Sequence, residues 1–143
     1  MKDTNNIIDY NCWSGTDYNN NTTQFSFSGT TGISSKEWSY TGENSLKVST
    51  TQAAQAFDIQ HMAVDSGKTV TISFAMHNPY IKVRAVIRAN TGELTTVSLP
   101  ASKEIKIITI SANVLENYDW VTLRCFLDQV GSCFIDDIIA NIS

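Results

Sequence analysis

The sequence predicts an all-β protein, an antiparallel β-sandwich of the jelly-roll type, and three observations carry this prediction. Several segments alternate apolar and polar residues with a period of two, as strands with one buried face do. Turn signals rich in Gly, Asn and Pro separate these segments. No apolar stripe of helical period has a useful length. About eight to ten strands at this spacing are typical of sandwiches and jelly rolls.

Two consecutive segments give the clearest strand signals. In residues 69–76 the apolar positions are Val70, Ile72, Phe74 and Met76. In residues 80–88 they are Ile81, Val83, Ala85 and Ile87. The other expected strands are residues 25–27, 45–49, 93–98, 104–111, 121–127 and 131–140. Residues 113–119 fit either one helical turn or a plain loop.

Length and composition limit the possible classes of protein. With 143 residues the chain is expected to form one domain, residues 1–143. The net charge of −4 gives no basic excess for nucleic acid, and no apolar run approaches the roughly 18 residues that span a bilayer. The first six residues lack the apolar core of a signal peptide. We therefore expect a protein that stays where it is made, a module of a longer chain, or a virion part.

The three cysteines are Cys12, Cys125 and Cys133, so at least one is unpaired. Neither Cys-x-x-Cys nor His-x-x-His occurs, so a zinc site is not expected. Cys125 and Cys133 face each other across a hairpin for only one of two turn lengths. The alternative is that they are buried thiols that act as small apolar groups.

No catalytic motif is visible in the sequence. It contains no Gly-x-Ser-x-Gly, no His-Glu-x-x-His and no phosphate-binding glycine loop. A glycosidase needs two carboxylates that face one cleft. Asp136 and Asp137 are adjacent in a strand, so simple alternation points them to opposite faces. The sequence therefore predicts that the protein is not an enzyme.

Four motifs resemble, in order, those of jelly-roll carbohydrate-binding modules of the family 4, 9, 16 and 22 type. The closing strand of these modules resembles Phe-Ile-Asp-Asp-Ile at residues 134–138. Their Gly-x-x-Ser-Leu-Lys-Val strand resembles residues 38–48, and their Gly-Lys-x-Tyr-x-Ile-Ser-Phe strand is similar to residues 64–74. Residues 121–124 look like the strand before the last hairpin. Together the motifs span most of the chain.

Two departures concern ligands rather than the fold. The Asn-x-x-Phe-Glu segment of these modules is blurred at residues 5–10. The aromatic residue that follows their Gly-Lys is replaced by Thr69-Val70. The resemblance implies a glycan groove on the polar face of one sheet, where aromatic rings stack on sugars and polar side chains bind hydroxyl groups.

Strand parity collects the candidates for this groove, which we expect on the exposed face of one sheet. The expected polar face carries Thr71, Ser73 and His77, then Tyr80, Lys82, Arg84 and Arg88, then Trp120, Thr122, Arg124, Phe126 and Asp128. Two further aromatic residues, Trp38 and Tyr40, flank a loop. The ligand-binding candidates are Trp38, Tyr40, His77, Tyr80, Arg84, Arg88, Trp120 and Arg124.

Several cations fall on this face although the chain is acidic overall. They are Lys82, Arg84, Arg88 and Arg124. One hypothesis is an anionic glycan, because guanidinium groups match carboxylate and sulfate oxygens. The alternative is a solvated face whose charges discourage aggregation.

The aromatic residues and histidines leave further alternatives open. Trp120 is either a platform at the rim of the groove or a plug in the core. Trp38 and Tyr40 are candidates for a platform at the sheet edge, and Trp13 is expected to anchor its loop on the core. Neither histidine has a carboxylate partner at motif spacing.

Calcium is the cofactor that the resemblance implies. The resembled modules hold a structural calcium ion between the first strand, the Gly-x-x-Ser-Leu strand and the terminal aspartate. By position this implies Asp136, Glu43 and Asp9 as ligands. The alternative is that Asp136 accepts hydrogen bonds from backbone amides or pairs with a lysine.

The sequence therefore predicts a non-catalytic module that binds a glycan or polysaccharide. Such a module would be part of a larger extracellular enzyme, an adhesin or a phage structural protein. The alternative is a structural or assembly domain, a virion decoration or oligomerisation module, with the same fold and no sugar binding. A homo-oligomer is expected if the protein is virion-associated. Neither nucleic acid nor membrane insertion is expected.

Overall fold

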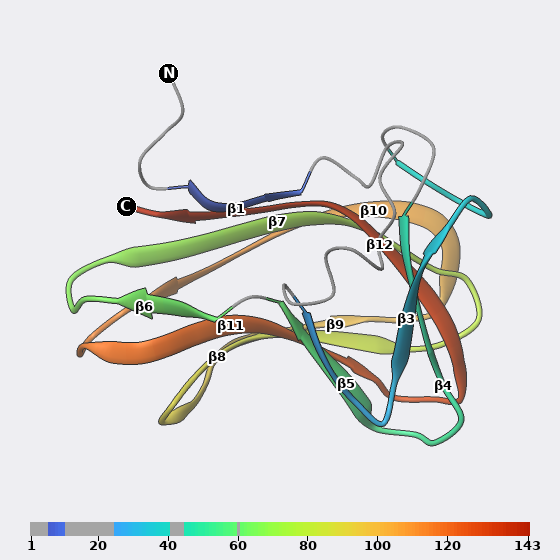
Figure 1. Cartoon of the computed structure of the whole chain (residues 1–143), viewed down its shortest axis with the longest axis horizontal. Coiled ribbons are helices and arrows are strands. Elements are labelled where there is room, and N and C mark those ends of the chain that lie inside the picture. The colour runs from blue at the N-terminus through green and yellow to red at the C-terminus, as the bar shows by residue number, and fades with distance from the viewer. Residues whose placement is uncertain (1–5, 11–24, 41–44, 60) are drawn as a thin grey trace.

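The computed structural model describes residues 6–10, 25–40, 45–59 and 61–143, which form two antiparallel six-stranded sheets packed face to face (Figure 1). This confirms the expected all-β sandwich. Among these residues none lies in a helix, so none of them forms a helix that could cross a membrane. Residues 114–117, where a helical turn was one alternative, form a loop.

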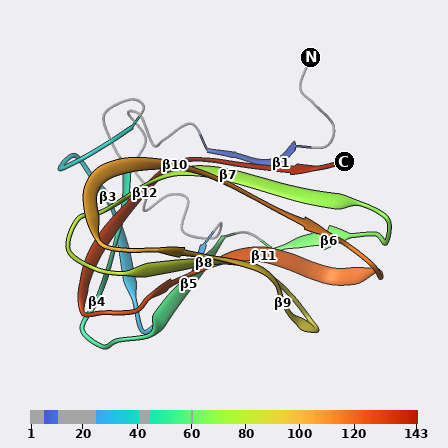
Figure 2. The ribbon, with the colours of Figure 1, turned by 180° about the vertical axis from the view of Figure 1, so that it is seen from behind.

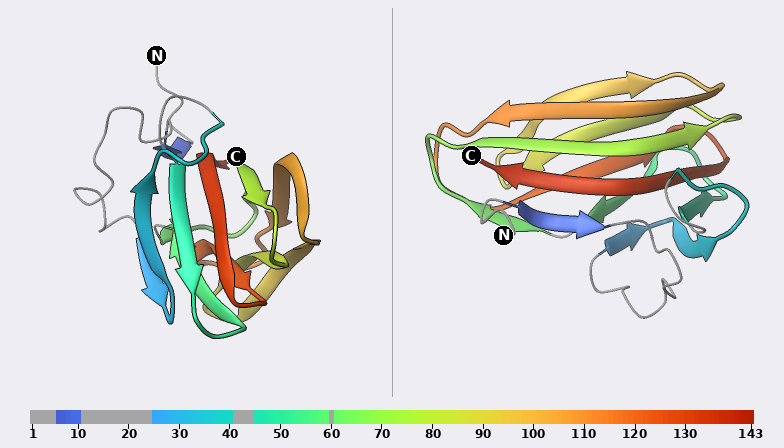
Figure 3. Two further views of the ribbon diagram at one scale, coloured as in Figure 1. Left: turned by 90° about the vertical axis from the view of Figure 1, so that its right-hand side faces the viewer. Right: turned by 90° about the horizontal axis from the view of Figure 1, so that it is seen from above.

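The first sheet, called sheet A, has the strand order β10-β7-β12-β4-β3, with β1 also paired to β12. Its strands are β10 (Ser102–Asn113), β7 (Thr69–Asn78), β12 (Gly131–Ile142), β4 (Ser45–Thr50), β3 (Thr31–Ser35) and β1 (Asn6–Tyr10). One edge of β12 serves two partners in turn: its first half pairs with β4, and its second half pairs with β1. Figure 3 shows β3, β4, β12, β7 and β10 side by side.

The second sheet, called sheet B, has the order β2-β5-β11-β8-β9, with β6 also paired to β11. Its strands are β2 (Phe25–Ser28), β5 (Gln55–Ile59), β11 (Tyr118–Leu127), β8 (Val83–Ala89), β9 (Gly92–Leu99) and β6 (Met62–Val64). The view from behind shows β8 and β11 running together beneath sheet A (Figure 2). Since β7 and β8 are consecutive but lie in different sheets, the connection between them crosses the sandwich.

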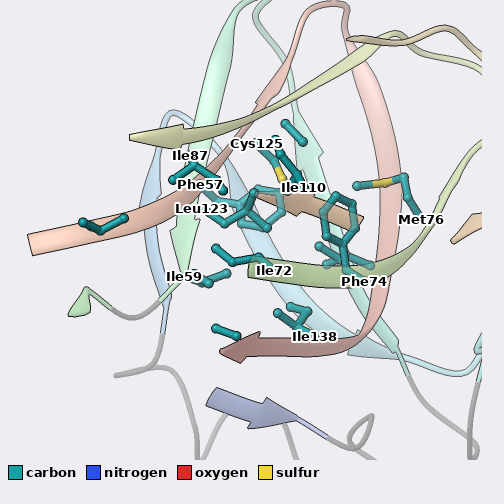
Figure 4. Packing of buried hydrophobic residues seen from close by; sticks show 14 of the residues in the cluster. Phe57, Ile59, Ile72, Phe74, Met76, Ile87, Ile110, Leu123, Cys125 and Ile138 are labelled. Atoms are coloured by element: carbon teal, nitrogen blue, oxygen red, sulfur yellow. The ribbon is translucent and has the colours of Figure 1, made fainter. Parts of the chain in front are cut away.

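The core lies between the sheets and is built from the inward positions of the long strands (Figure 4). The side chains predicted to face inward on β7 and in residues 80–88 are all at most 1% exposed. Phe57, Leu46 and Leu123 are among the largest fully buried side chains. Burial of one such side chain contributes about 2–3 kcal/mol. Alternation thus identified the core correctly on both sheets.

Cys125 and Cys133 lie in this core as free, fully buried thiols. The alternative in which they face each other across a hairpin is excluded, because β11 belongs to sheet B and β12 to sheet A. Burial raises the pKa of both thiols, that of Cys133 to about 12, and the nearby Cys133 adds to the rise for Cys125. They therefore behave as small apolar groups. Cys12 and Trp13 lie outside the described residues.

A β-bulge interrupts β12 at the Asp-Asp pair. Asp136 pairs with Ala75 of β7, but the next pair joins Ile139 to Ser73, so two residues of β12 oppose Phe74 alone. Asp137 takes up the extra length with a left-handed backbone (φ 55°). The bulge reverses the phase of the strand. Simple alternation across the two aspartates, as expected from the sequence, does not hold here.

Candidate functional site

The outward side of sheet B carries a group of charged and aromatic side chains that contact one another. Its strands place alternate residues outward, opposite the buried positions such as Leu123 and Ala85. We call this surface the sheet B face. It is defined by Asp58 of β5, Arg84 and Arg88 of β8, and Trp120, Arg124 and Phe126 of β11.

Arg124 and Asp58 form a bidentate ion pair at the centre of this face. The Arg124 Nε donates to Asp58 Oδ1 over 2.6 Å, and Nη2 donates to Oδ2 over 2.9 Å. The register of β11 and β5 sets these residues directly opposite each other. The hydrogen bond to Asp58 raises the pKa of Arg124. Asp58 is only 7% exposed, so this pair gives a nearly buried carboxylate its hydrogen-bond partner.

The Asp58 carboxylate also contacts His61, which belongs to an aromatic pair on this face. His61 Nε2 lies 3.2 Å from Asp58 Oδ2. The His61 ring stacks on Trp120, with centroids 4.8 Å apart and planes inclined by 19°. Trp120 is half-buried, so of the two alternatives for it the structure favours a surface position over a core plug. The sequence showed no carboxylate partner for His61 at motif spacing, but in the structure His61 contacts Asp58, because β5 and β6 pair with consecutive parts of the same edge of β11.

Arg84 of β8 lies opposite Phe126, near the other end of β11. Its Nε donates to Asp128 Oδ2 over 2.8 Å, and its guanidinium carbon lies 4.4 Å from the centroid of the Phe126 ring. The hydrogen bond to Asp128 raises the pKa of Arg84. The Arg84 side chain is therefore held in place by a carboxylate and an aromatic ring.

Arg88, unlike Arg124 and Arg84, is not paired with any aspartate that the structure describes. It lies opposite Thr122 of β11 and Glu93 of β9. Within the part of the chain that the structure describes, Arg88 has neither an ion pair nor a hydrogen bond, and its Nε is buried without a partner. A buried donor without a partner costs about 1–3 kcal/mol.

A shallow hollow of about 230 Å³ lies beside the central ion pair, between β2, β5 and β11. Ser26, Ser28, Asp58 and Arg124 line it with polar groups, and Phe126 contributes an aromatic wall. It is smaller than a typical small-molecule pocket. It extends the polar surface of the face toward β2.

His77 does not belong to this face. The expectation that Thr71, Ser73 and His77 share one sheet surface with the arginines was wrong, because β7 lies in sheet A and β8 in sheet B. Strand parity gives the face of a strand but not its sheet. His77 packs between aromatic residues on the outward side of sheet A, where Trp38 stacks on it at 5.2 Å and Phe134 lies 5.9 Å away. Burial, with a smaller contribution from Lys106, lowers the pKa of His77.

The remaining aromatic candidates are spread over the molecule. Trp38 is half-buried by its stack on His77, and Tyr40 is 50% exposed on the same side of the sandwich. Tyr80 is 79% exposed in the connection that leads into β8. The candidates therefore separate into a group on sheet B (Arg84, Arg88, Trp120, Arg124), a group on sheet A (Trp38, Tyr40, His77), and Tyr80 in the exposed connection between β7 and β8.

Asp136, the central residue of the expected calcium site, is fully buried. Its Oδ2 accepts the backbone N–H of Tyr40 over 2.6 Å, and its Oδ1 accepts that of Asp137 over 3.0 Å. These hydrogen bonds match the alternative to calcium binding, in which Asp136 accepts hydrogen bonds from backbone amides. Glu43 and the side chain of Asp9 lie outside the described residues. The residues that are described contain no cluster of three or more His, Cys, Asp or Glu that could hold a metal.

Comparison with known proteins gives structural similarity only. Neither a protein-family model nor a curated protein matches the sequence. The C-terminal family 22 carbohydrate-binding module of Clostridium thermocellum Xyn10B superposes with a TM-score of 0.71 at 14% identity, covering 99% of this chain and 97% of that chain. The N-terminal cellulose-binding domain of Cellulomonas fimi β-1,4-glucanase C gives a TM-score of 0.62 at 15% identity, covering 83% of this chain and 88% of that one.

A phage protein is also similar. The enzymatically active domain of tailspike protein 4 from bacteriophage CBA120 gives a TM-score of 0.68 at 12% identity, covering 97% of this chain but only 22% of that chain. The tailspike chain is therefore much longer than the part that this chain resembles. The chain has the β-sandwich fold of the carbohydrate-binding modules, as its sequence motifs predicted.

Proposed function

We propose that the protein is a non-catalytic module that binds a polysaccharide on the sheet B face. The observation that carries the proposal is the arrangement of this face: aromatic rings and hydrogen-bonding side chains stand together on one sheet surface. Trp120 with His61 offers a flat apolar surface, on which a sugar ring can stack. Arg124, Asp58 and the hollow beside them offer donors and acceptors for hydroxyl groups.

The fold supports the proposal by analogy. The similar module of Xyn10B is described for ligand binding in its cleft, and the similar domain of Cellulomonas fimi is a cellulose-binding domain. Function inferred from fold alone is analogy, so the residues of the face carry the argument. An extracellular setting, as part of a larger protein, is part of the same proposal.

Two tryptophans provide a matched test. Affinity electrophoresis and calorimetry with cellulose-derived and xylan-derived polysaccharides would measure binding by the wild type, Trp120→Ala and Trp38→Ala. We expect Trp120→Ala to weaken binding at least ten-fold, because a stacking surface is lost. Trp38→Ala should lower stability and leave binding unchanged, since Trp38 lies over sheet A. Retention of no polysaccharide by the wild type would contradict the proposal.

A second candidate function is assembly within a virion. The similarity to a phage tailspike, of which this chain covers only 22%, favours it. In that case the module would contact protein and form a homo-oligomer. Light scattering after size exclusion tests this: a stable trimer without polysaccharide binding supports assembly, and a monomer that binds polysaccharide supports the first candidate.

A structural calcium ion at Asp136 remains a further proposal. Asp136 stands near β1, since Ile139 of the same strand pairs with Asp9. Carboxylate oxygens are suitable calcium ligands, but six to eight oxygen ligands are needed. Both oxygens of Asp136 already accept backbone N–H groups, so a calcium ion would have to share this carboxylate with them.

A further inference from the structure

The arginines of the sheet B face are not equivalent. Asp58 and Asp128 neutralise Arg124 and Arg84 within the chain, each through a short hydrogen bond to the guanidinium Nε. A guanidinium that already holds a carboxylate offers an acidic ligand little uncompensated charge. If the ligand has an acidic group, these two arginines are poor candidates to receive it.

Arg88 is the exception among the described cations of this face. Its two strand neighbours are engaged elsewhere: the Thr122 hydroxyl donates to the Ile59 carbonyl oxygen, and Glu93 accepts a hydrogen bond from Thr96 and forms no ion pair with Arg88. Arg88 is half-buried, so it is not simply a solvated surface charge. Its buried Nε has no acceptor within the described part of the chain.

Arg88 also lies close to the residues that we propose for sugar binding. Thr122, the register partner of Arg88, lies two residues from Trp120 and two from Arg124 along β11. Each spacing corresponds to about 7 Å. Arg88 therefore lies beside the line that joins the aromatic surface to the central ion pair. A substituent of a sugar stacked on Trp120 would come within reach of it.

We propose that Arg88 binds a carboxylate of the glycan, so that the ligand is a polysaccharide containing uronic acid. This inference rests on the proposed function of the sheet B face. A guanidinium binds a carboxylate through two parallel hydrogen bonds, which a neutral hydroxymethyl group cannot reproduce. The net charge of −4 opposes general attraction of polyanions, so their binding requires a local site such as this.

A carboxyl-reduced polysaccharide is the matched probe, because reduction replaces the carboxylate by a hydroxymethyl group and leaves the backbone intact. Calorimetry in about 0.15 M salt, close to physiological ionic strength, would compare glucuronoxylan, polygalacturonate, alginate and hyaluronan, each with its carboxyl-reduced form. We expect at least one acidic form to bind ten-fold or more tightly than its reduced form, as one charge-assisted contact supplies.

Four variants test whether Arg88 is responsible for the preference for the acidic form. Arg88→Gln should reduce the preference for the acidic form to about one, while Arg88→Lys restores part of it through charge alone. Glu93→Gln, which removes the nearest strand-neighbour carboxylate, should strengthen acidic binding. Lys68→Gln removes an exposed cation from the turn before β7 and should preserve the preference. Circular dichroism and melting curves confirm that each variant is folded.

The outcomes separate the two proposals. Equal binding of acidic and reduced forms, or an unchanged preference in Arg88→Gln, overturns the role of Arg88 and leaves polysaccharide binding intact. Binding of no polysaccharide in either form overturns the proposed function itself. A preference that disappears in Lys68→Gln as well as in Arg88→Gln would identify general charge attraction and overturn the local site.

Discussion

The ion pair between Arg124 and Asp58 gives the sharpest prediction for stability. Asp58→Ala removes both hydrogen bonds and leaves the Arg124 guanidinium without a counter-charge. Breaking a buried pair costs about 3–5 kcal/mol. The Arg124 side chain is 26% exposed, so water screens part of this, whereas the Asp58 side chain is 9% exposed. We therefore expect Asp58→Ala to lower the free energy of unfolding by about 2–3 kcal/mol.

The assay is urea unfolding followed by tryptophan fluorescence, since guanidinium chloride is a salt and would screen the pair. At about 3–4 °C per kcal/mol for a domain of this size, the melting temperature should fall by about 6–12 °C. The double variant Asp58→Leu with Arg124→Met removes both charges. It should be more stable than Asp58→Ala, because no unpaired charge remains.

The double-mutant cycle decides whether this reasoning holds. With Arg124→Met as the other single variant, the coupling energy between the two positions should be at least about 1 kcal/mol. A loss below about 0.5 kcal/mol in Asp58→Ala, or strictly additive single effects, would refute it. In that case the pair would behave as an ordinary solvated surface contact.

Three other predictions concern pH, thiols and calcium. The pKa of His77 is lowered by burial first and by Lys106 second, so the unfolded chain binds the proton more readily; stability should fall as pH drops below about 6.5, and His77→Gln should remove this part of the melting-temperature profile. Burial raises the pKa of Cys125 and Cys133, so in a Cys12→Ser background both thiols should resist Ellman's reagent until unfolded, and stability should fall above about pH 9 as the unfolded thiols ionise. If calcium binds at Asp136, the melting temperature should fall with a chelator, and Asp136→Asn should abolish that difference; equal melting curves would contradict the calcium site.

Much of the fold could be predicted from the sequence because alternation records burial directly. The inward residues of β7 and of residues 80–88 are buried as expected. The short strands β3, β5 and β6 have weaker patterns: β5 buries four consecutive residues from Ala56 to Ile59, so period-two alternation is lost. Burial on both faces of a strand hides it from this kind of reasoning.

The site could be predicted only in part because parity is a property of one strand. It identified Arg84, Arg88, Trp120 and Arg124 as outward residues, and the register of β8 and β11 brings them onto one surface. It could not show that β7 and β8 belong to different sheets, so His77 was placed wrongly. Asp58 and His61 were missed as members of the face. Their spacing of three residues was the available signal.

The bulge at Asp137 divides β12 into two halves that can open separately. Residues 131–135 pair with β4, whereas residues 138–141 pair with β1. Between them the ladder is interrupted, so separation of β1 from β12 need not propagate to β4. Hydrogen exchange should then be faster and independent in the second half. Opening of this kind would be confined to sheet A, so the sheet B face on the other layer would keep its geometry when β1 separates from β12.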